Sequence, residues 1–134
     1  MTYPLYIPVV TLSDQERARR EAKQLAAAQG LSHDKVEAVG LAVSELASNL
    51  RRYALHGEIV LSTLHSSIDT GIQVESRDQG PGIEDIDLAM HDGFSTAGGL
   101  GSGLPGVRRL MDEFEITSAQ KGTTVVARKW SRQS

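Results

Sequence analysis

The sequence predicts an α+β fold, a two-layer α/β sandwich in which a mostly antiparallel sheet is covered on one face by helices. Two observations favour this class. Stretches of helical and of strand character are mixed along the chain, and the strand-like stretches come in neighbouring pairs. The length of 134 residues and the 40% hydrophobic content suit one compact domain, so residues 1–134 are expected to form a single domain.

The N-terminal part predicts a strand followed by two helices. Residues 5–11 are apolar and β-branched, and Ser13 is the expected N-cap of a helix over residues 14–29 that Gly30 ends. A second helix is expected over residues 33–54, because apolar side chains recur there at helical spacing. They are Val36, Val39, Val43, Ala47 and Leu50.

The remaining strands are expected in two antiparallel pairs. Residues 58–64 and 68–75 are rich in β-branched side chains, and a short serine-containing turn separates them. Residues 114–119 and 123–128 form the second pair, around a Lys-Gly turn.

A glycine-rich stretch lies between these pairs. Within it, residues 83–90 are compatible with a short helix, and residues 104–111 predict another, with Pro105 in its first turn. Such a density of glycine indicates a mobile loop or a close approach of the backbone to a ligand.

Composition excludes several classes of function. The formal net charge of -3, from 14 basic and 17 acidic residues, gives no basic field for nucleic acid or an anionic membrane, so neither is an expected partner. The absence of cysteine excludes disulfides and thiolate chemistry. The N-terminus does not resemble a signal peptide and no apolar run approaches spanning length, so a cytoplasmic location is expected.

The second predicted helix carries a candidate catalytic pair. Glu45 and Asn49 are four residues apart, so their side chains emerge on one face, away from the apolar stripe. Asn49 can give an oxygen to hydrated Mg²⁺, while Glu45 orients or deprotonates an attacking hydroxyl. Taken alone, such a pair is more often a solvated structural feature.

Two glycine motifs follow. The run Asp78-Gln79-Gly80-Pro81-Gly82 comes directly after a predicted strand. It is either a tight turn or an acceptor at the sheet end with glycines that let a flat base approach. The run from Gly98 to Leu104 leads into a helix, and its successive N–H groups can converge on phosphate. The alternative is a flexible linker, which the interleaved leucines disfavour. Neither a Rossmann nor a Walker fingerprint fits.

Together these motifs resemble the GHKL ATP-binding superfamily, whose domains have the Bergerat fold. The matching motifs are Glu45-x-x-x-Asn49, Asp78-x-Gly80-x-Gly82, Gly99-Leu100-Gly101-x-Gly103-Leu104 and Gly122-Thr123. The resemblance implies ATP and Mg²⁺ as cofactors, with Glu45 as general base, Asn49 as the Mg²⁺ ligand, Asp78 as acceptor for the adenine amino group and Thr123 as a water-mediated adenine contact. The implied nucleotide-binding residues are Asn49, Asp78, Gly80, Gly82, Gly99, Gly101, Ser102, Gly103 and Thr123.

The chain from about Leu5 to Trp130 is further similar to the RsbT-type switch kinases of stressosome signalling. The identifying runs are Glu45-Leu46-Ala47-x-Asn49, Asp78 to Ile83, Asp92 to Thr96 and Pro105-Gly106-Val107. The resemblance implies a serine/threonine kinase that phosphorylates STAS-domain antagonist and scaffold proteins and, on release, activates a PP2C-type phosphatase. Arg51-Arg52 departs from the apolar or aromatic residues expected in relatives, and its role is left unassigned.

Two other functions remain to be separated from this one. An anti-sigma factor of the same fold needs the same ATP pocket, but the segment 92–106 resembles the RsbT type more closely. The catalytic half of a histidine kinase is disfavoured, because no phospho-accepting helical hairpin is present in the sequence.

Overall fold

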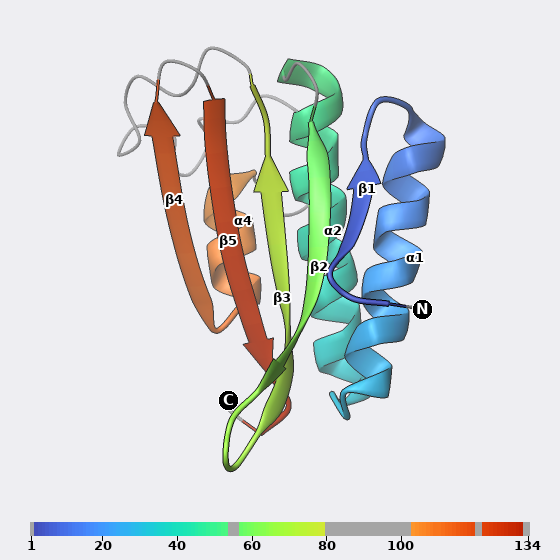
Figure 1. Ribbon diagram of the computed structural model, residues 1–134, viewed down its shortest axis with the longest axis vertical. Helices are drawn as coiled ribbons and strands as arrows, with labels where there is room; N and C mark the ends of the chain where they lie inside the picture. Colours follow the sequence, from blue (N-terminus) through green and yellow to red (C-terminus); the bar gives the residue numbers. More distant parts are fainter. Residues whose placement is uncertain (1, 54–56, 80–102, 120–121, 133–134) are drawn as a thin grey trace.

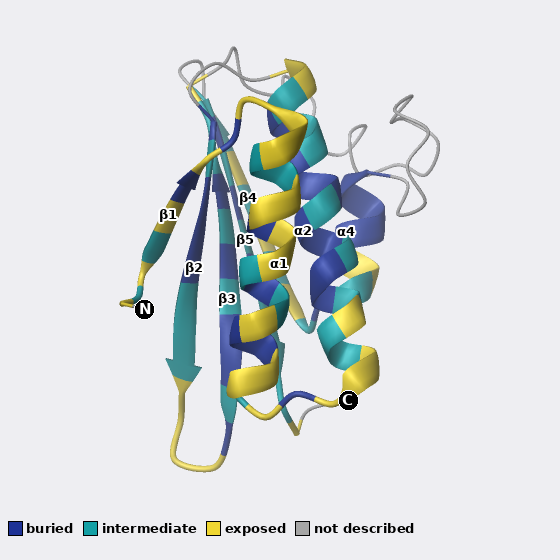
Figure 2. Cartoon of the chain, turned by 90° about the vertical axis from the view of Figure 1, so that its right-hand side faces the viewer, coloured by how far each residue is buried: buried dark blue, intermediate teal, exposed yellow. Residues whose placement is uncertain are grey.

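The computed structural model describes residues 2–53, 57–79, 103–119 and 122–132. In this part of the chain, a five-stranded antiparallel sheet in the order β1-β2-β3-β5-β4 carries its helices on one face (Figures 1 and 2). The elements are β1 (Leu5–Pro8), α1 (Leu12–Ala28), α2 (His33–Tyr53), β2 (Glu58–His65), β3 (Thr70–Arg77), α4 (Leu104–Leu110), β4 (Glu113–Ala119) and β5 (Gly122–Trp130). The predicted α+β sandwich is confirmed. The helix considered for residues 83–90 lies outside the described residues.

The start of α1 differs from the prediction, because Thr11 and not Ser13 is the N-cap. The Thr11 hydroxyl accepts a hydrogen bond from the backbone N–H of Asp14 at 3.1 Å, and the Asp14 carboxylate accepts one from the N–H of Thr11 at 3.0 Å. This reciprocal capping box satisfies two N–H groups at once. The backbone N–H groups of Thr11 and Val10 also hold the pKa of Asp14 below its usual value. Ser13, which Glu16 follows at the same spacing, lies within the first turn of α1 and is therefore not the cap.

The turn between β2 and β3 explains a second difference. The strand predicted over residues 68–75 lies instead at Thr70–Arg77, since Ser66 and Asp69 close the turn. The backbone N–H of Ser66 donates to the carbonyl of Asp69 at 2.9 Å, and the Ser66 hydroxyl accepts from the N–H of Asp69 at 3.0 Å. Ile68 consequently lies in the turn and is 75% exposed.

The core lies between the helices and the facing side of the sheet (Figure 2). Alternate strand positions point into it, as the period of two requires. From the sheet they include Ile59, Leu61, Ile72, Val74, Val125 and Ala127, and from α2 they include Val39, Val43, Leu46 and Leu50. The apolar stripe predicted from the sequence is therefore the face of α2 that packs on the sheet.

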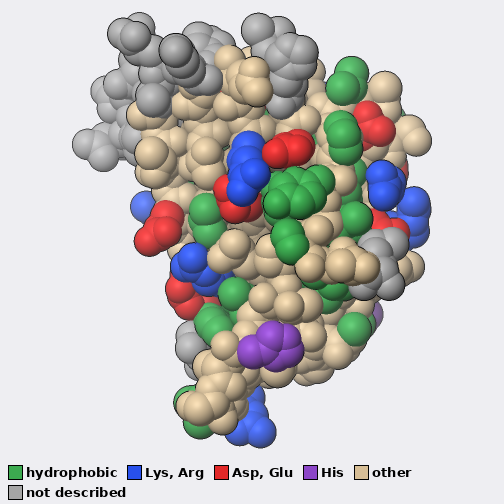
Figure 3. All heavy atoms as spheres, viewed as in Figure 1, with side chains coloured by type: hydrophobic (Ala, Val, Ile, Leu, Met, Phe, Trp, Pro, Cys, Tyr) green, Lys and Arg blue, Asp and Glu red, His purple; other side chains and the backbone are tan. Residues whose placement is uncertain are grey.

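Among the described elements, no helix covers the opposite face of the sheet. Figure 3 shows acidic and basic side chains interspersed with hydrophobic ones on this face, without a large field of one sign. Tyr6 is 52% exposed, and the Arg77 guanidinium lies 5.9 Å from the centre of its ring. Within the described ranges, no helix is both long enough and apolar enough to span a bilayer.

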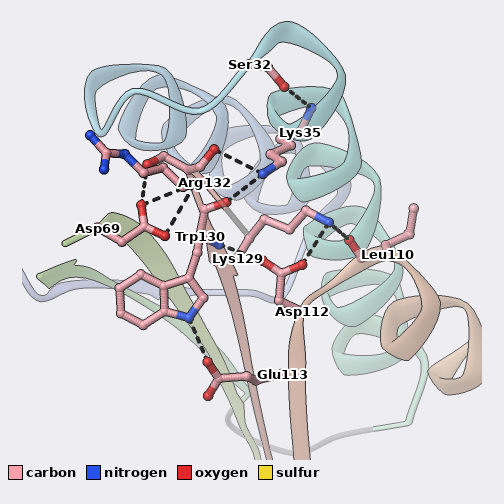
Figure 4. Close-up of polar contacts among 10 residues, drawn as sticks. Ser32, Lys35, Asp69, Leu110, Asp112, Glu113, Lys129, Trp130 and Arg132 are labelled. Atoms are coloured by element: carbon pink, nitrogen blue, oxygen red, sulfur yellow. Dashed lines mark hydrogen bonds and ion pairs between the residues drawn. The ribbon is translucent and has the colours of Figure 1, made fainter. Parts of the chain in front are cut away.

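Side-chain bonds tie the C-terminal end of β5 to its neighbours (Figure 4). Lys129 forms an ion pair with Asp112 at 3.5 Å and donates a hydrogen bond to the carbonyl of Leu110 at 2.8 Å, which holds the end of α4 against β5. Lys35 of α2 donates to the carbonyls of Trp130 and Ser131 at 3.1 and 3.0 Å. The end of the last strand is thereby fixed to two helices.

The buried carboxylate of Asp69 belongs to the same end of the molecule (Figure 4). The hydroxyl of Ser131 donates to it and is the main cause that holds the pKa of Asp69 below its ordinary value, with the backbone N–H groups of Thr70 and Arg132 acting in the same direction. The charged form is therefore favoured by folding.

We expect Asp69→Asn to lower the free energy of unfolding at neutral pH. Folding lowers the pKa of Asp69, so its contribution to the free energy of unfolding is fully present above the unfolded-state pKa of 3.8. This contribution is lost as the pH falls through the lower pKa of the folded state. The difference between parent and variant should shrink below that pH, as measured by urea unfolding at neutral pH and at about pH 3. Glu115→Gln, at an exposed carboxylate on β4, is the control. A difference for Asp69→Asn that is constant over this range would contradict the expectation.

Candidate functional site

Three segments meet at the end of the sheet that lies uppermost in Figure 1: the end of β3, the start of β5 and the last turn of α2. Antiparallel register aligns the two strands, since Arg77 pairs with Thr124. The last turn of α2 packs against the residue that precedes β2. A Cβ added to Gly57 would lie 2.8 Å from the Leu50 side chain. Residues that are far apart in the sequence therefore converge at this end.

Asp78 and Thr123 are joined directly there. The backbone N–H of Asp78 donates to the carbonyl of Thr123 at 3.0 Å, and the N–H of Thr123 donates to the Asp78 carboxylate at 3.2 Å. The Thr123 hydroxyl lies 3.2 Å from that of Ser118, and Thr123 is only 8% exposed. The Asp78 carboxylate, which can accept hydrogen bonds, and the Thr123 hydroxyl, which can accept and donate them, are thus both held at this end of the sheet.

Glu45 and Asn49 lie in the C-terminal half of α2. Successive helical residues are about 100° apart, so these two share the flank opposite to Gly40. That residue faces α1, because a Cβ added to it would lie 2.8 Å from Lys23. The other flank is the side on which α4 packs. Glu45 is 7% exposed, which is unusual for a carboxylate unless it has a specific role or partner. The flank that carries the predicted catalytic pair is therefore shielded from water at Glu45.

The cation beside Asp78 in sequence is neutralised on the uncovered face. Arg77 pairs with Glu75 and, at 3.6 Å, with Glu58. The hydrogen bond to Glu75 is the main cause that raises the pKa of Arg77 above its usual value. The charge of Arg77 is consequently taken up by acidic neighbours within the sheet.

Gly103 stands where the second glycine motif enters α4. Its φ of 68° is in the left-handed region, which explains a glycine at this junction. Pro105 lies in the first turn of α4, as predicted. The other predicted glycine-motif residues, Gly80, Gly82, Gly99, Gly101 and Ser102, lie outside the described residues.

Two features of this end were not found from the sequence. One is the direct pairing of Asp78 with Thr123. The family resemblance implied only that each of these residues contacts adenine separately. The other is the bond from Arg51 to Gln15 at 2.7 Å, which assigns a contact to an arginine that sequence patterns left without a role. For the pairing of Asp78 with Thr123, the only signal in the sequence was the Lys-Gly turn between the two predicted C-terminal strands.

Gly122 controls the contact between β5 and Asp78. Its φ is 152°, and a Cβ added there would collide with the carbonyl oxygen of Asp78. We expect Gly122→Ala to cost about 1–3 kcal/mol of stability through this collision and to weaken ADP binding, because the backbone of Asp78 must move. Thermal unfolding and calorimetric titration with ADP are the measurements.

Gly30→Ala is the matched control for Gly122→Ala. Gly30 also has a positive φ, 89°, but no atom lies within 4 Å of an added Cβ. This variant has only the backbone strain, about 1–2 kcal/mol, and should leave ADP affinity unchanged. Equal ADP affinities for the two variants would show that Gly122 does not control the position of Asp78.

The chain matches a family of known proteins over most of its length. The family described as "Histidine kinase-like ATPase domain" matches residues 10–129. The chain is 42% identical to the serine/threonine-protein kinase RsbT of Bacillus subtilis, over 94% of this chain and 96% of that protein. It is 33% identical to an anti-sigma F factor of Caldanaerobacter subterraneus, over 72% of this chain and 71% of that protein.

Among solved structures, the fold is similar to a crystal structure of the RsbU and RsbW domains of a Mycobacterium tuberculosis protein, with a TM-score of 0.66 at 21% identity. That match covers 99% of this chain but 34% of the longer one. The histidine kinase AdeS of Acinetobacter baumannii has a TM-score of 0.53 at 14% identity, over 98% of this chain and 70% of that chain. At these identities the likeness concerns the fold.

Proposed function

The chain belongs to the histidine kinase-like ATPase domain family and to its RsbT-type serine/threonine protein kinases, and from this premise we propose that it phosphorylates STAS-domain regulatory proteins with ATP and Mg²⁺. The observation that carries the proposal is the hydrogen-bonded pairing of Asp78 with Thr123 at the end of the sheet where α2, the helix that bears the buried Glu45, also ends. In this arrangement, the ends of β3 and β5 would recognise adenine, and α2 would supply the group that takes the proton.

The chemistry of these side chains fits an adenine nucleotide with Mg²⁺. The Asp78 carboxylate would accept a hydrogen bond from the adenine amino group, and the Thr123 hydroxyl would hold a bridging water. Asn49 would offer a carboxamide oxygen, the hard ligand type that Mg²⁺ prefers. The bound nucleotide and cation supply the phosphoryl group and neutralise its charge. Gly80, Gly82, Gly99, Gly101, Ser102 and Gly103 are proposed to contact the nucleotide through the two glycine motifs.

Glu45 is proposed as the general base. Its carboxylate would take the proton from the serine or threonine hydroxyl of the substrate protein while that oxygen bonds to phosphorus and the bond to ADP breaks. The low exposure of Glu45 supports this role, because a general base shielded from water accepts its proton from the substrate hydroxyl and not from a water molecule.

For partners, we propose STAS-domain antagonist and scaffold proteins of a stressosome. Once the kinase is released from them, it is proposed to bind and activate a PP2C-type phosphatase. The proposed location is the cytoplasm. The match to RsbT over nearly its whole length supports this assignment. A protein that carries RsbU and RsbW domains also has a region of the same fold.

A direct phosphotransfer assay tests the proposal. The purified chain is incubated with labelled ATP, Mg²⁺ and STAS-domain proteins encoded near its gene. We expect label on a serine or threonine of the STAS protein, and none when Mg²⁺ is chelated. Absence of transfer to every STAS protein, with ATP bound, would contradict the kinase assignment.

An anti-sigma factor is the second candidate, since anti-sigma F factors are among the relatives at 33% identity. It predicts ATP-dependent capture of a sigma factor from the same organism. The higher identity and coverage of the RsbT match favour the switch-kinase assignment.

A further inference from the structure

One side-chain bond joins the first turn of α1 to the last turn of α2. The Nε–H of Arg51 donates to the side-chain oxygen of Gln15 at 2.7 Å, and both residues are half-buried. A hydrogen bond from a charged donor is stronger than one between neutral groups. It links two helices through residues that are 36 positions apart in the sequence.

Arg51 lies on the flank of α2 opposite to the candidate site. At about 100° per residue, Arg51 and Gly40 share the flank that faces α1, Leu50 points to the sheet, and Asn49 is on the far side. A helix end tends to fray, because its last carbonyl groups have no partner within the helix. Leu50 against Gly57 and Arg51 against Gln15 restrain this turn from two directions.

We infer that Arg51 is a positioning residue: its bond to Gln15 holds the last turn of α2 in the orientation that presents Asn49 to a nucleotide-bound Mg²⁺. The inference rests on the proposed function, since it uses the role of Asn49 as a Mg²⁺ ligand. A rotation or loosening of this turn moves the carboxamide of Asn49, whereas Glu45, one turn earlier, is within the packed part of the helix.

Arg51 also places a positive charge in the last turn of α2, which stabilises a helix C-terminus by itself. Gln15→Leu separates the two effects, because it removes the bond and leaves the charge. Lys23→Met is the matched control. It removes another link between α1 and α2, the 3.0 Å ion pair of Lys23 with Glu37, at the other end of α2.

The test compares Arg51→Met, Gln15→Leu and their double variant with Lys23→Met and with the parent. The first readout is hydrogen exchange of the amides of residues 50–53 in the nucleotide-free protein. The second is the Mg²⁺ concentration that half-saturates the gain in ADP affinity, measured by calorimetry. We expect about tenfold faster exchange and a several-fold higher Mg²⁺ requirement for both single variants, with no further change in the double variant.

Lys23→Met should leave both readouts near the parent values. The inference is overturned if Gln15→Leu behaves like Lys23→Met, or if the effects of the two single variants add in the double variant. Asn49→Asp separates this failure from that of the proposed function. If Asn49→Asp leaves the Mg²⁺ requirement unchanged, the proposed role of Asn49 is wrong and the inference with it. If that variant shifts the requirement and Arg51→Met does not, the inference alone is wrong.

Discussion

Asp78→Asn is expected to weaken ADP binding by at least about 10- to 100-fold. The amide oxygen of the variant can still accept from the N–H of Thr123, but its NH₂ group then faces the amino group of adenine. Two donors directed at each other leave both unsatisfied, at a cost of about 1–3 kcal/mol. Titration calorimetry with ADP measures the loss, and circular dichroism checks that the variant is folded.

Asp69→Asn is the matched control for this experiment. It makes the same chemical change at a buried carboxylate, that of Asp69, at the opposite end of β3. It should lower stability and leave ADP affinity unchanged. Unchanged affinity in Asp78→Asn would remove Asp78 from the nucleotide site, and equal losses in both variants would trace the effect to general destabilisation.

Glu45→Gln is expected to lower phosphotransfer to the substrate protein by about 10²–10⁴-fold while ADP affinity is largely kept. The amide has nearly the shape of the carboxylate but cannot take a proton at neutral pH. Because Glu45 is 7% exposed, the same shape also keeps the packing around it. Single-turnover transfer of labelled phosphate measures the rate.

Glu37→Gln serves as the control for Glu45→Gln, because it alters an exposed glutamate on the same helix. Its phosphotransfer rate should match that of the parent. A normal rate in Glu45→Gln would show that another group acts as the base. A loss of ADP affinity equal to the loss of rate would make Glu45 a binding residue.

Local patterns in the sequence determined most of the secondary structure. The helical spacing of apolar residues from Val36 to Leu50 predicted α2 and its buried face, and alternating β-branched residues predicted the strand pairs. These signals lie within a few residues of one another, so they need no knowledge of the rest of the chain. The order of the motifs likewise allowed the ATP-binding family to be identified before the fold was known.

The tertiary structure alone decided which distant residues touch. Asp78 and Thr123 are 45 positions apart and meet because the register of β3 with β5 aligns the strand ends. Arg51 meets Gln15 because packing of the whole core sets the rotation of α2 against α1. Sheet register and helix rotation depend on many long-range contacts together, and no local pattern in the sequence contains them.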